Sequence, residues 1–455
     1  MQETYQDLIE DVSSQIAEEL LGEESWLDTH RLMLDEKVFE LMLRIGLATL
    51  HLVFLELAGR QIEKCRDAGM VIHKRADIDI STRMGRVPDV PSPTLRDPGT
   101  GETSRPMKDQ FGLRGNGKTL SLERALSDFG SETSYGEAER MFREHYGFDI
   151  GRTSILRVTR DVGEDAEEYL ETRLASVAEE YGLPPRERAS SADELVVQLD
   201  GCLIRTGELK TARQAGLGAE DGYEPDDKVR VQDWREVRTG LVRGLDEVDA
   251  LYACRRGDYE TICDQLFALA VERGLTPETM VVGCGDGGKG LMEAMQVVFA
   301  RFAFVLDYSH LKGHFYETAE ALGLEEDMRP EWVESFIDEL WEEDVDDWDD
   351  QLEQILGRLR ELHQECQNDR LDNLIDYVEK FSDAIQFSRF EDNGWPTGSG
   401  EVESAHKQLP QARLKLAGAC WRVENLNPML AMRVLKKNEW WSDFWQWREN
   451  QRLAA

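Results

Sequence analysis

Four acidic residues stand where their side chains could hold metal ions. Asp200 follows the β-forming run ELVVQL and is expected to end its strand, and Asp286 is expected to end the strand that contains the run TMVVGCG. Glu401 and Glu403 follow a glycine-rich turn at the start of a predicted helix. Mg²⁺ prefers hard oxygen ligands and keeps several waters that a substrate phosphate can replace. Such carboxylates could hold two divalent ions about 3.5 to 4 Å apart, which would activate a water or 3′-hydroxyl and stabilise the leaving oxygen of a phosphodiester.

The segment 191–310 is predicted to carry the two aspartates on strands. Three β-forming runs lie close together, and strand and helix then alternate. This order predicts an antiparallel meander that continues into a parallel α/β half. In an RNase H-like mixed sheet the first and fourth strands are neighbours, and a terminal helix brings a third carboxylate over them. The predicted strands are 194–207, 234–244, 250–257, 279–287 and 302–310, with a helix at 259–275.

The rest of the chain is expected to be helical. Residues 311–393 are strongly acidic and are interpreted as a helical insertion with a solvated charged face. Residues 394–455 then carry the third carboxylate on a helix, followed by a basic tail. Residues 1–88 are expected to form an all-α N-terminal region that ends at 89–106, a stretch of linker composition. The predicted fold class is therefore α/β, and a length of 455 residues favours two or three domains.

Residues 107–190 are predicted to contain two helices joined by a tight turn. Gly147 breaks the chain, and the second helix is expected to begin near Thr153, with Arg152 and Arg157 along it. Two short helices with a glycine between them are typical of a helix-turn-helix, which places its second helix in the DNA major groove. A plain helical hairpin has the same pattern, so both interpretations stay open.

A glycine-rich motif offers a competing function. The run VVGCGDGGKG (281–290) contains GxGxxG between a strand and a helix, and Asp307 lies 19 residues beyond Gly288, the spacing of a dinucleotide-binding fingerprint. However, the strand lies mid-chain behind a meander, and no further strand and helix units follow Asp307. A P-loop fails because Gly290 stands where Ser or Thr must reach Mg²⁺. We interpret the glycines as a strand end that presents Asp286.

Four motifs together resemble a known family. They are VVQLDGCLIRTGELK, GCGDGG, FVLDYSHLKGH and GWPTGSGEVESAHKQLPQARLK with a following GACW. Their order resembles that of prokaryotic insertion-sequence DDE transposases of the ISKra type. The similarity covers 190–425 well and 109–170 more loosely, and the last motif is the most specific. The resemblance implies an RNase H-like core that cuts transposon ends and joins them to target DNA.

The resemblance also assigns roles to single residues. It implies that Asp200, Asp286 and Glu403 are the catalytic and metal-binding acids of a site for two Mg²⁺ or Mn²⁺ ions. Glu401 is the alternative third acid, because helical spacing puts it nearer the apolar stripe of its helix. The remaining two candidates, Asp307 and His310, resemble a D/CxxH pair. They would orient metal or DNA, or Asp307 would only hydrogen-bond at a strand end.

The charge balance is strongly acidic. The formal net charge is −38, and there are 14 lysines against 39 arginines. Acid excess normally argues against nucleic acid, because phosphate binding depends on Lys and Arg displacing counterions. Acidity spread over every segment with few lysines also suits a halophile, since 1 M salt shortens the Debye length to about 3 Å. Local basic clusters are then the informative signal.

The strongest basic cluster follows the predicted catalytic glutamate. Residues 404–437 contain seven basic side chains and one acidic one. We expect this segment to hold the DNA backbone beside the site; pairing with the acidic insertion is the alternative. The DNA-binding candidates are Lys407, Arg413, Lys415 and Arg422, with Arg152 and Arg157 of the predicted helix-turn-helix.

Other features of the sequence indicate where the protein is located and which kinds of site it lacks. The apolar run 38–57 is broken by Arg44, His51 and two glutamates, so we expect a buried or amphipathic helix and no membrane contact. The N-terminus lacks the regions of a signal peptide, which favours a cytoplasmic protein. Seven cysteines without a CxxC pair argue against a disulfide framework or a structural zinc site.

The predicted function is that of a metal-dependent DDE transposase, a polynucleotidyl transferase or nuclease acting on transposon ends and target DNA. By analogy it would act as a homodimer or higher oligomer. Two alternatives remain: a catalytically inactive DNA-binding relic or regulator of the same lineage, and a dinucleotide-binding enzyme whose NAD(P) binding a Gly285 substitution would abolish.

Overall fold

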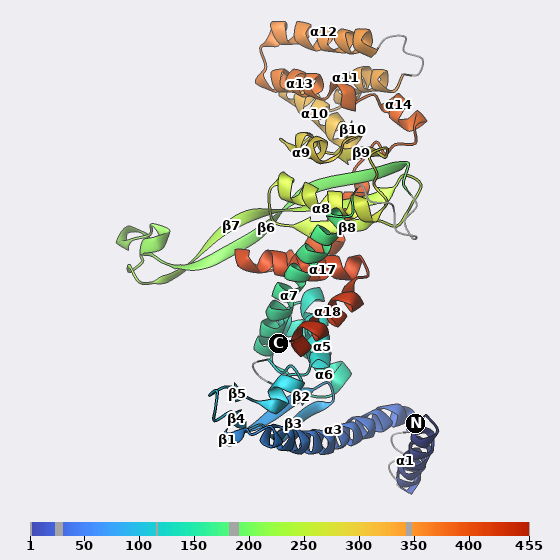
Figure 1. Cartoon of the computed structure of the whole chain (residues 1–455). Coiled ribbons are helices and arrows are strands. Elements are labelled where there is room, and N and C mark those ends of the chain that lie inside the picture. Colours follow the sequence, from blue (N-terminus) through green and yellow to red (C-terminus); the bar gives the residue numbers. More distant parts are fainter. Residues whose placement is uncertain (1, 23–30, 115–116, 182–190, 343–347, 455) are drawn as a thin grey trace. The chain divides into compact units, whose positions relative to one another are not determined.

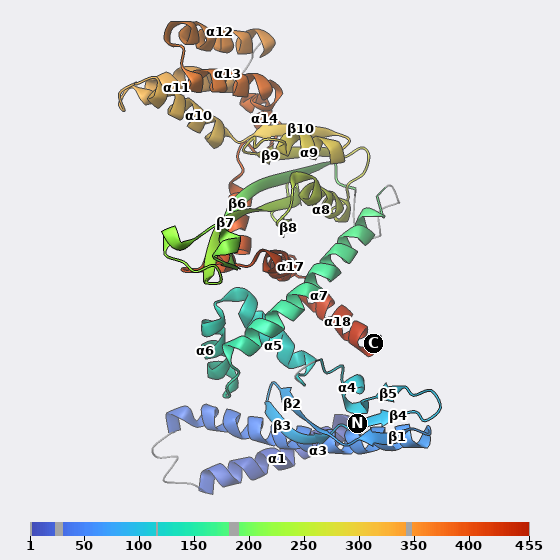
Figure 2. The same cartoon turned by 90° about the vertical axis from the view of Figure 1, so that its left-hand side faces the viewer.

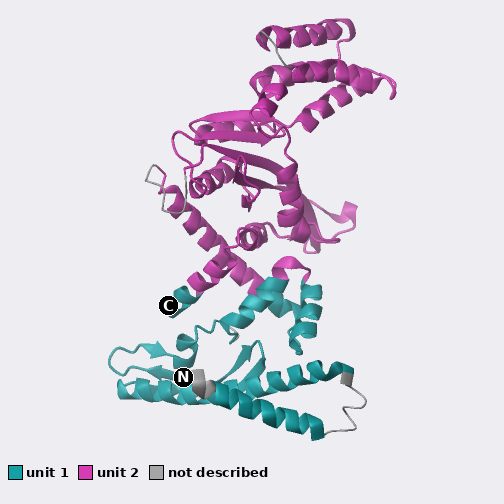
Figure 3. Ribbon diagram, turned by 90° about the vertical axis from the view of Figure 1, so that its right-hand side faces the viewer, with its two compact units in different colours: residues 1–129, 135–155, 449–455 teal, residues 130–134, 156–448 magenta. Residues whose placement is uncertain are grey.

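The computed structural model describes residues 2–22, 31–114, 117–181, 191–342 and 348–454. The chain divides into two compact units, which are described separately (Figure 3). Unit 1 comprises residues 1–129, 135–155 and 449–455, and unit 2 comprises residues 130–134 and 156–448. The five segments expected from the sequence are finer than this division and stay predictions.

Unit 1 begins with helices and continues with short strands. The helices are present as expected, but the expectation of an all-α region up to residue 88 is wrong from residue 71 onward, where strands begin. In Figure 2, β2 and β3 lie against α3. The elements are α1 (Gln2–Gly22), η1 (Arg31–Met33), α3 (Leu34–Asp67), β1 (Val71–Lys74), β2 (Asp77–Thr82), β3 (Gly85–Pro91), β4 (Thr94–Arg96) and β5 (Thr103–Ser104).

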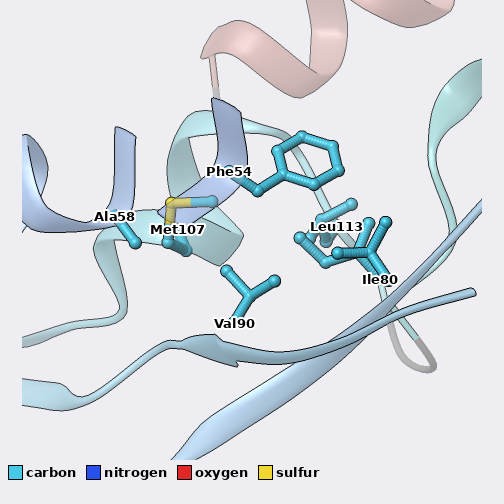
Figure 4. Close-up of a cluster of buried hydrophobic side chains, with 7 residues drawn as sticks. Phe54, Ala58, Ile80, Val90, Met107 and Leu113 are labelled. Carbon is cyan, nitrogen blue, oxygen red and sulfur yellow. The ribbon is translucent and has the colours of Figure 1, made fainter. Parts of the chain in front are cut away.

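The β2–β3 hairpin of unit 1 packs its apolar residues against α3. β2 pairs antiparallel with β3, and β4 lies between β1 and β5. Alternating residues of the hairpin turn inward, as a strand with one buried face requires. The Pro and Gly content of 89–106 is therefore that of short strands and turns, and this stretch is not a linker. The buried cluster is Phe54, Ala58, Ile80, Val87, Val90, Met107 and Leu113 (Figure 4).

Four further helices follow before the large sheet. They are α4 (Pro106–Gln110), α5 (Leu120–Glu132), α6 (Tyr135–Tyr146) and α7 (Arg152–Ala178). α6 and α7 are the two helices predicted from the sequence, and Gly147 between them has φ +74°, a conformation that glycine adopts without strain. The helical pair is confirmed, and its role in DNA binding stays a prediction.

Unit 2 is built on a five-stranded mixed sheet in the order β10-β9-β6-β7-β8. β10, β9 and β6 are parallel, and β7 is antiparallel to both β6 and β8. The five strands predicted from the sequence are all present, which confirms a mixed α/β class. They are β6 (Glu194–Thr211), β7 (Lys228–Gly244), β8 (Leu251–Arg255), β9 (Met280–Gly285) and β10 (Phe302–Leu306).

β6 and β7 are longer than predicted and form a hairpin arm. They pair without a break from Leu195 opposite Gly244 to Thr211 opposite Lys228, and the arm extends beyond the other strands (Figure 1). Asp200 therefore lies inside β6, and the expectation that it ends the strand is wrong. It does lie where the parallel neighbour β9 ends, because β9 pairs only as far as Gln198.

Helices cover the two faces of this sheet. α8 packs on β7, where Gly240 lets Leu266 approach; a Cβ at Gly240 would lie 2.8 Å from that side chain. The opposite face carries α15, whose Val402 is fully buried and bonds Gln198 of β6. Both helices are thus held by long-range contacts with the sheet. Their bounds are α8 (Tyr259–Glu272) and α15 (Gly400–His406), with α9 (Leu291–Val298) between β9 and β10.

The predicted helical insertion separates β10 from α15. In α12, Leu352, Ile355, Leu356 and Leu359 are buried at helical spacing, while the acidic residues between them stay exposed. The elements are α10 (Tyr308–Ala321), α11 (Arg329–Ile337), η4 (Asp338–Trp341), α12 (Trp348–Cys366), α13 (Asp369–Lys380), η5 (Ser382–Ala384) and α14 (Phe387–Asp392).

The chain ends in a series of helices after α15. The first is a π-helical turn, η6 (Lys407–Gln411), which contains Pro410. Proline removes a helical hydrogen bond, and the helix departs from regular α geometry at this position. The later elements are α16 (Ala412–Leu414), η7 (Val423–Asn425), α17 (Leu426–Lys437) and α18 (Trp441–Ala454).

Candidate active site

Asp200 lies within β6, and Asp286 is the first residue after the neighbouring parallel strand β9. The register of β6 and β9 pairs Gln198 with Cys284 at its end, and each aspartate stands two residues beyond that pair. Neighbouring strands lie about 4.8 Å apart, so this register brings the two carboxylates to one edge of the sheet. The predicted adjacency of the first and fourth strands is confirmed.

Asp307 continues this row on β10, because Leu306 pairs with Gly285. Its side chain is only 2% exposed. One carboxylate oxygen accepts bonds from the backbone N and the Oγ of Ser399, both 2.6 Å, and the other accepts the backbone N of His310 at 2.9 Å. Burial would raise the pKa of Asp307, but these hydrogen bonds outweigh it and lower the pKa. The geometry is thus that of strand-end hydrogen bonding.

His406 holds the Asp200 carboxylate. This imidazole is 4% exposed, its Nδ1 lies 3.3 Å from Oδ2 of Asp200, and its Nε2 lies 3.2 Å from the Asp200 carbonyl oxygen. The other carboxylate oxygen of Asp200 accepts the backbone N of Gly201 at 2.6 Å. A buried side chain of α15 therefore lies against the first acid and is hydrogen-bonded to its backbone carbonyl.

Asp286 stands in a tight turn between tyrosines. Its Oδ1 accepts the backbone N of Gly288 at 2.9 Å, and its carbonyl accepts the hydroxyl of Tyr377 at 2.9 Å. Burial raises the pKa of Tyr377 and Tyr259, and the nearby charge of Asp286 adds to the rise. A Cβ at Gly288 would lie 2.9 Å from the Tyr259 hydroxyl, so glycine is needed for this close approach.

α15 lies along β6 and turns its two glutamates to opposite sides. Glu401 forms a two-bond ion pair of 2.7 and 2.8 Å with Arg243 of β7, whose side chain is 11% exposed. Residues two apart on a helix point about 200° apart, so Glu403 projects away from the side of α15 on which Glu401 meets Arg243. Glu403 is exposed, and its side chain forms no hydrogen bond or ion pair within the described part of the chain.

The donors at this edge suit a hard cation, but they are not preassembled around one. Within the described parts of the chain, no group of three or more His, Cys, Asp or Glu side chains is arranged to hold a metal ion. The oxygens of Asp200 are turned toward His406 and Gly201. The donor set thus fits Mg²⁺ in chemistry and in strand register, and liganding by three residues would require side-chain rotation.

The glycine-rich motif has a packing role. A Cβ at Gly283 would lie 2.6 Å from the ring of Phe302, and one at Gly285 would lie 3.2 Å from Leu291. The large sheet ends at β10, with no further strand beyond it among the described residues. These observations favour the interpretation of a strand end that presents Asp286 over that of a dinucleotide site.

Arg413 does not reach the surface where DNA was expected. It is 3% exposed, donates to the carbonyl of Gly130 at 3.0 Å, and lies over the ring of Trp421. Trp421 in turn bridges to β6, where Arg205 donates to the carbonyl of Ala419. Arg413 and the tryptophan of the GACW motif therefore hold the C-terminal helices on the hairpin arm.

A second buried arginine bonds the carbonyls of the π-helical turn. The guanidinium of Arg433 donates to the carbonyls of Leu409, at 2.6 Å, and of Gln408, and it pairs with Glu132 at 2.9 Å. These carbonyls lie in the π-helical turn, where regular helical bonding is disturbed. The turn after the proposed catalytic helix is thus held by a charged residue of α17.

The other predicted DNA-binding residues are exposed. Lys407, Lys415 and Arg422 lie on the surface of unit 2, with Arg422 3.6 Å from Glu424. Arg152 and Arg157 are exposed on α7. His310, unlike its neighbour Asp307, is exposed as well. These positions remain candidates for contact with DNA.

Three residues of the site were not singled out from the sequence. Gln198, His406 and Arg243 position the acids, and their partners lie 158 to 206 residues away in the chain. Gln198 could have been noticed as the one polar residue in the run VVQL, where burial demands a hydrogen-bond partner. His406 lies four residues after Val402, on the apolar face of the predicted helix.

Comparison with known proteins adds little beyond the geometry. No family model matches the chain, and no curated protein matches it in sequence. The structure has a likeness to a chain of a Drosophila P element transposase strand transfer complex, with a TM-score of 0.31 and 12% identity, covering 69% of this chain and 91% of that chain. A likeness this low carries no argument about function.

Proposed function

We propose that this chain is a DNA transposase with an RNase H-like core, similar in plan to the ISKra type, that cuts and joins DNA by DDE chemistry. The observation that carries the proposal is the shared register of Asp200 and Asp286 on adjacent parallel strands, with α15 fixed across the same edge. The strand order, in which only the second strand runs antiparallel to its neighbours, supports the RNase H-like class.

The proposed metal-binding acids are Asp200, Asp286 and Glu403. Glu403 is preferred over Glu401, because Glu401 is engaged with Arg243 while the exposed side chain of Glu403 has no ion pair among the described residues. Two Mg²⁺ or Mn²⁺ ions would supply an activated water or 3′-hydroxyl and neutralise charge on the phosphodiester.

The protein's own residues would hold this site in place. His406 orients Asp200, and Asp307 fixes the start of α15 through Ser399. Arg243 holds the opposite side of the same helix. Positioning residues of this kind typically change metal affinity or activity by about 10- to 100-fold when they are removed.

Exposed basic residues would hold the DNA backbone beside the site. Lys407 follows α15 directly and Lys415 follows α16, and the charge of Lys415 acts on Cys202, two residues beyond Asp200 in β6. Phosphate contacts of this kind position the substrate without reading its sequence. Two copies would act together if the enzyme pairs two transposon ends.

The test is a strand-transfer assay with the ends of the chain's own element, run with Mg²⁺ and with Mn²⁺. Asp286→Asn and Glu403→Gln should abolish joining, because each removes a carboxylate ligand, whereas Glu401→Gln should retain joining and lose stability. Full joining by Asp286→Asn would contradict the proposal. Equal loss in Glu401→Gln and no loss in Glu403→Gln would move the third acid to Glu401.

A catalytically inactive, DNA-binding relic is the second candidate. It shares the fold and the basic surface, and it is favoured by the orientation of Asp200, whose carboxylate oxygens are turned toward His406 and Gly201. It predicts sequence-specific binding to the element's ends without metal-dependent cleavage. The same assay, with a gel-shift measurement beside it, separates the two.

A further inference from the structure

α3 has two apolar faces, and the described residues cover only one of them. Phe54 and Ala58 belong to the buried cluster of unit 1, and Leu47 and Leu50 pack against it. The opposite side carries large apolar residues that remain open to solvent: Leu52 is 70% exposed and Ile45 is 37% exposed. Contiguous exposed apolar surface of this kind marks an interaction site in a folded protein.

The exposed side follows a heptad pattern. Its residues are spaced alternately by four and three positions. All of them carry apolar side chains except Gly59. Such spacing over four heptads is the signature of a two-stranded coiled coil. The seam comprises Leu34, Val38, Leu41, Ile45, Ala48, Leu52, Leu55, Gly59 and Ile62.

The covered face and the seam point in different directions. At about 100° per residue, the centre of the Leu47, Leu50 and Phe54 stripe lies well over 120° from the centre of the seam. The helix can therefore keep its contacts with β2 and β3 while the seam binds a partner. α3 spans 34 residues, or roughly 50 Å at 1.5 Å per residue, which is long enough for a stable two-stranded coil.

The residue types at the seam select the partner. β-branched Val38 and Ile45 occupy the first heptad position, together with Leu52 and Gly59, and leucines predominate at the fourth, which Ala48 and Ile62 share. In a parallel coil, β-branched residues at the first position with leucine at the fourth favour two strands. In a parallel, in-register pair, His51 of one copy faces Glu56 of the other, and no like charges meet at the flanking positions. We propose that α3 pairs with α3 of a second copy in a parallel coiled coil.

A membrane is the main rival. By length and composition alone, α3 is the one helix among the described residues that could cross a membrane, and 6% of its most apolar window is buried. However, one face of α3 is packed on the β2–β3 hairpin, whose polar edges would have to enter the lipid with it. Glu40, Arg44 and Glu56 also lie within the helix. These features favour a protein partner over lipid.

The first experiment measures the mass of the full-length protein in solution at micromolar concentration by light scattering. We expect twice the chain mass of 52.0 kDa. Leu52→Lys should weaken the dimer on the order of a hundredfold, because two buried leucines are replaced by repelling charges. Val53→Lys is the matched control: Val53 is also exposed, at 44%, but lies off the seam. A monomeric wild type, or equal effects of both variants, overturns the proposal.

The second experiment fixes the orientation and excludes lipid. In a Val38→Cys variant, oxidation should form a disulfide between the introduced cysteines of two copies. Mass spectrometry of the linked peptide identifies this bond. Because each chain carries only one cysteine at position 38, a bond between two such cysteines joins two chains. In a mixture of the Val38→Cys and Ile62→Cys variants, linkage of one introduced cysteine to the other would show an antiparallel pair and contradict the proposal. The wild type is also tested for flotation with phosphatidylcholine vesicles. If the wild type is monomeric and floats with the vesicles, and Leu52→Lys does not float, the seam binds a membrane and the proposal is wrong.

The inference does not depend on the proposed chemistry, because it concerns α3 of unit 1 and its readout is mass. If the protein is a dimer but performs no strand transfer, the coiled-coil proposal stands and the proposed transposase activity is contradicted. If a Leu52→Lys variant is monomeric with and without DNA and still performs strand transfer, the proposed chemistry stands. Pairing through α3 is then not required for strand transfer.

Discussion

At the scale of single residues, the candidate site depends on buried polar partners of the acids. Asp200 is held by His406, Asp307 by Ser399, and Glu401 by Arg243. A carboxylate at a strand end is common in an acidic chain, so its type and position alone do not define a site. The buried partner is what separates an oriented carboxylate from a solvated one.

Replacing His406 with Ala should leave the fold intact and loosen Asp200. The expected result is a fall of about 10- to 100-fold in Mn²⁺ affinity and in strand transfer, since the first acid loses its orienting partner. Mn²⁺ titration followed by electron paramagnetic resonance measures the affinity. Ser404→Ala, an exposed position on the same helix, is the control. Unchanged Mn²⁺ affinity in the His406→Ala variant would remove its positioning role.

Replacing Asp307 with Asn should reduce the free energy of unfolding by about 1 to 3 kcal/mol at pH 7, because buried donors of Ser399 lose a charged acceptor. The pKa of Asp307 is lowered in the folded state, so its contribution is present above its ordinary pKa and is lost as pH falls through the lowered value. The difference between wild type and variant should therefore shrink below about pH 4. Urea unfolding at pH 7 and pH 3 measures it; a constant difference would contradict this account.

At the scale of elements, the basic C-terminal segment divides into buried and exposed residues. Arg413 and Arg433 are buried and bond backbone carbonyls, whereas Arg422 and Lys415 are exposed. The charge pattern in the sequence predicts a basic surface, but only the packing tells which of these charges are available to a phosphate.

Arg433→Ala should therefore act on stability and Arg422→Ala on DNA binding. Loss of the charged hydrogen bonds to Leu409 and Gln408 should cost about 2 to 3 kcal/mol. The exposed Arg422 should change stability by less than about 0.5 kcal/mol and lower DNA affinity in a salt-dependent way. Thermal unfolding and gel-shift titrations of the two variants measure this contrast. Equal destabilisation by both would contradict it.

At the scale of the whole molecule, the net charge of −38 should make stability depend strongly on salt. Repulsion among carboxylates is long-ranged in dilute buffer and is screened within about 3 Å at 1 M salt. The free energy of unfolding should therefore rise from dilute buffer to molar KCl. Urea titrations in KCl, compared with sucrose of equal osmolality, separate screening from solute exclusion. If the free energy of unfolding is highest in dilute buffer, the halophile interpretation is wrong.

Local patterns in the sequence predicted much of the large sheet and its insertion. The five strands, the helical insertion and the helix of the VES motif follow from apolar period, turn residues and composition. The strands of residues 71–104 were missed, because short strands rich in Pro and Gly have the composition of a linker. The length of the β6–β7 arm was underestimated, because polar residues such as Arg205 and Glu208 interrupt its pattern.

What the sequence by itself determined is therefore the order of elements, the acids placed on them and the charge of the chain. The tertiary structure alone decided the shared row of Asp200, Asp286 and Asp307, the pairing of Glu401 with Arg243 and the burial of Arg413. The physical reason is the separation along the sequence over which each kind of interaction acts. Periodicity and capping act over a few residues, whereas Arg413 bonds a carbonyl 283 residues away, and a contact of that separation leaves no mark in a local pattern.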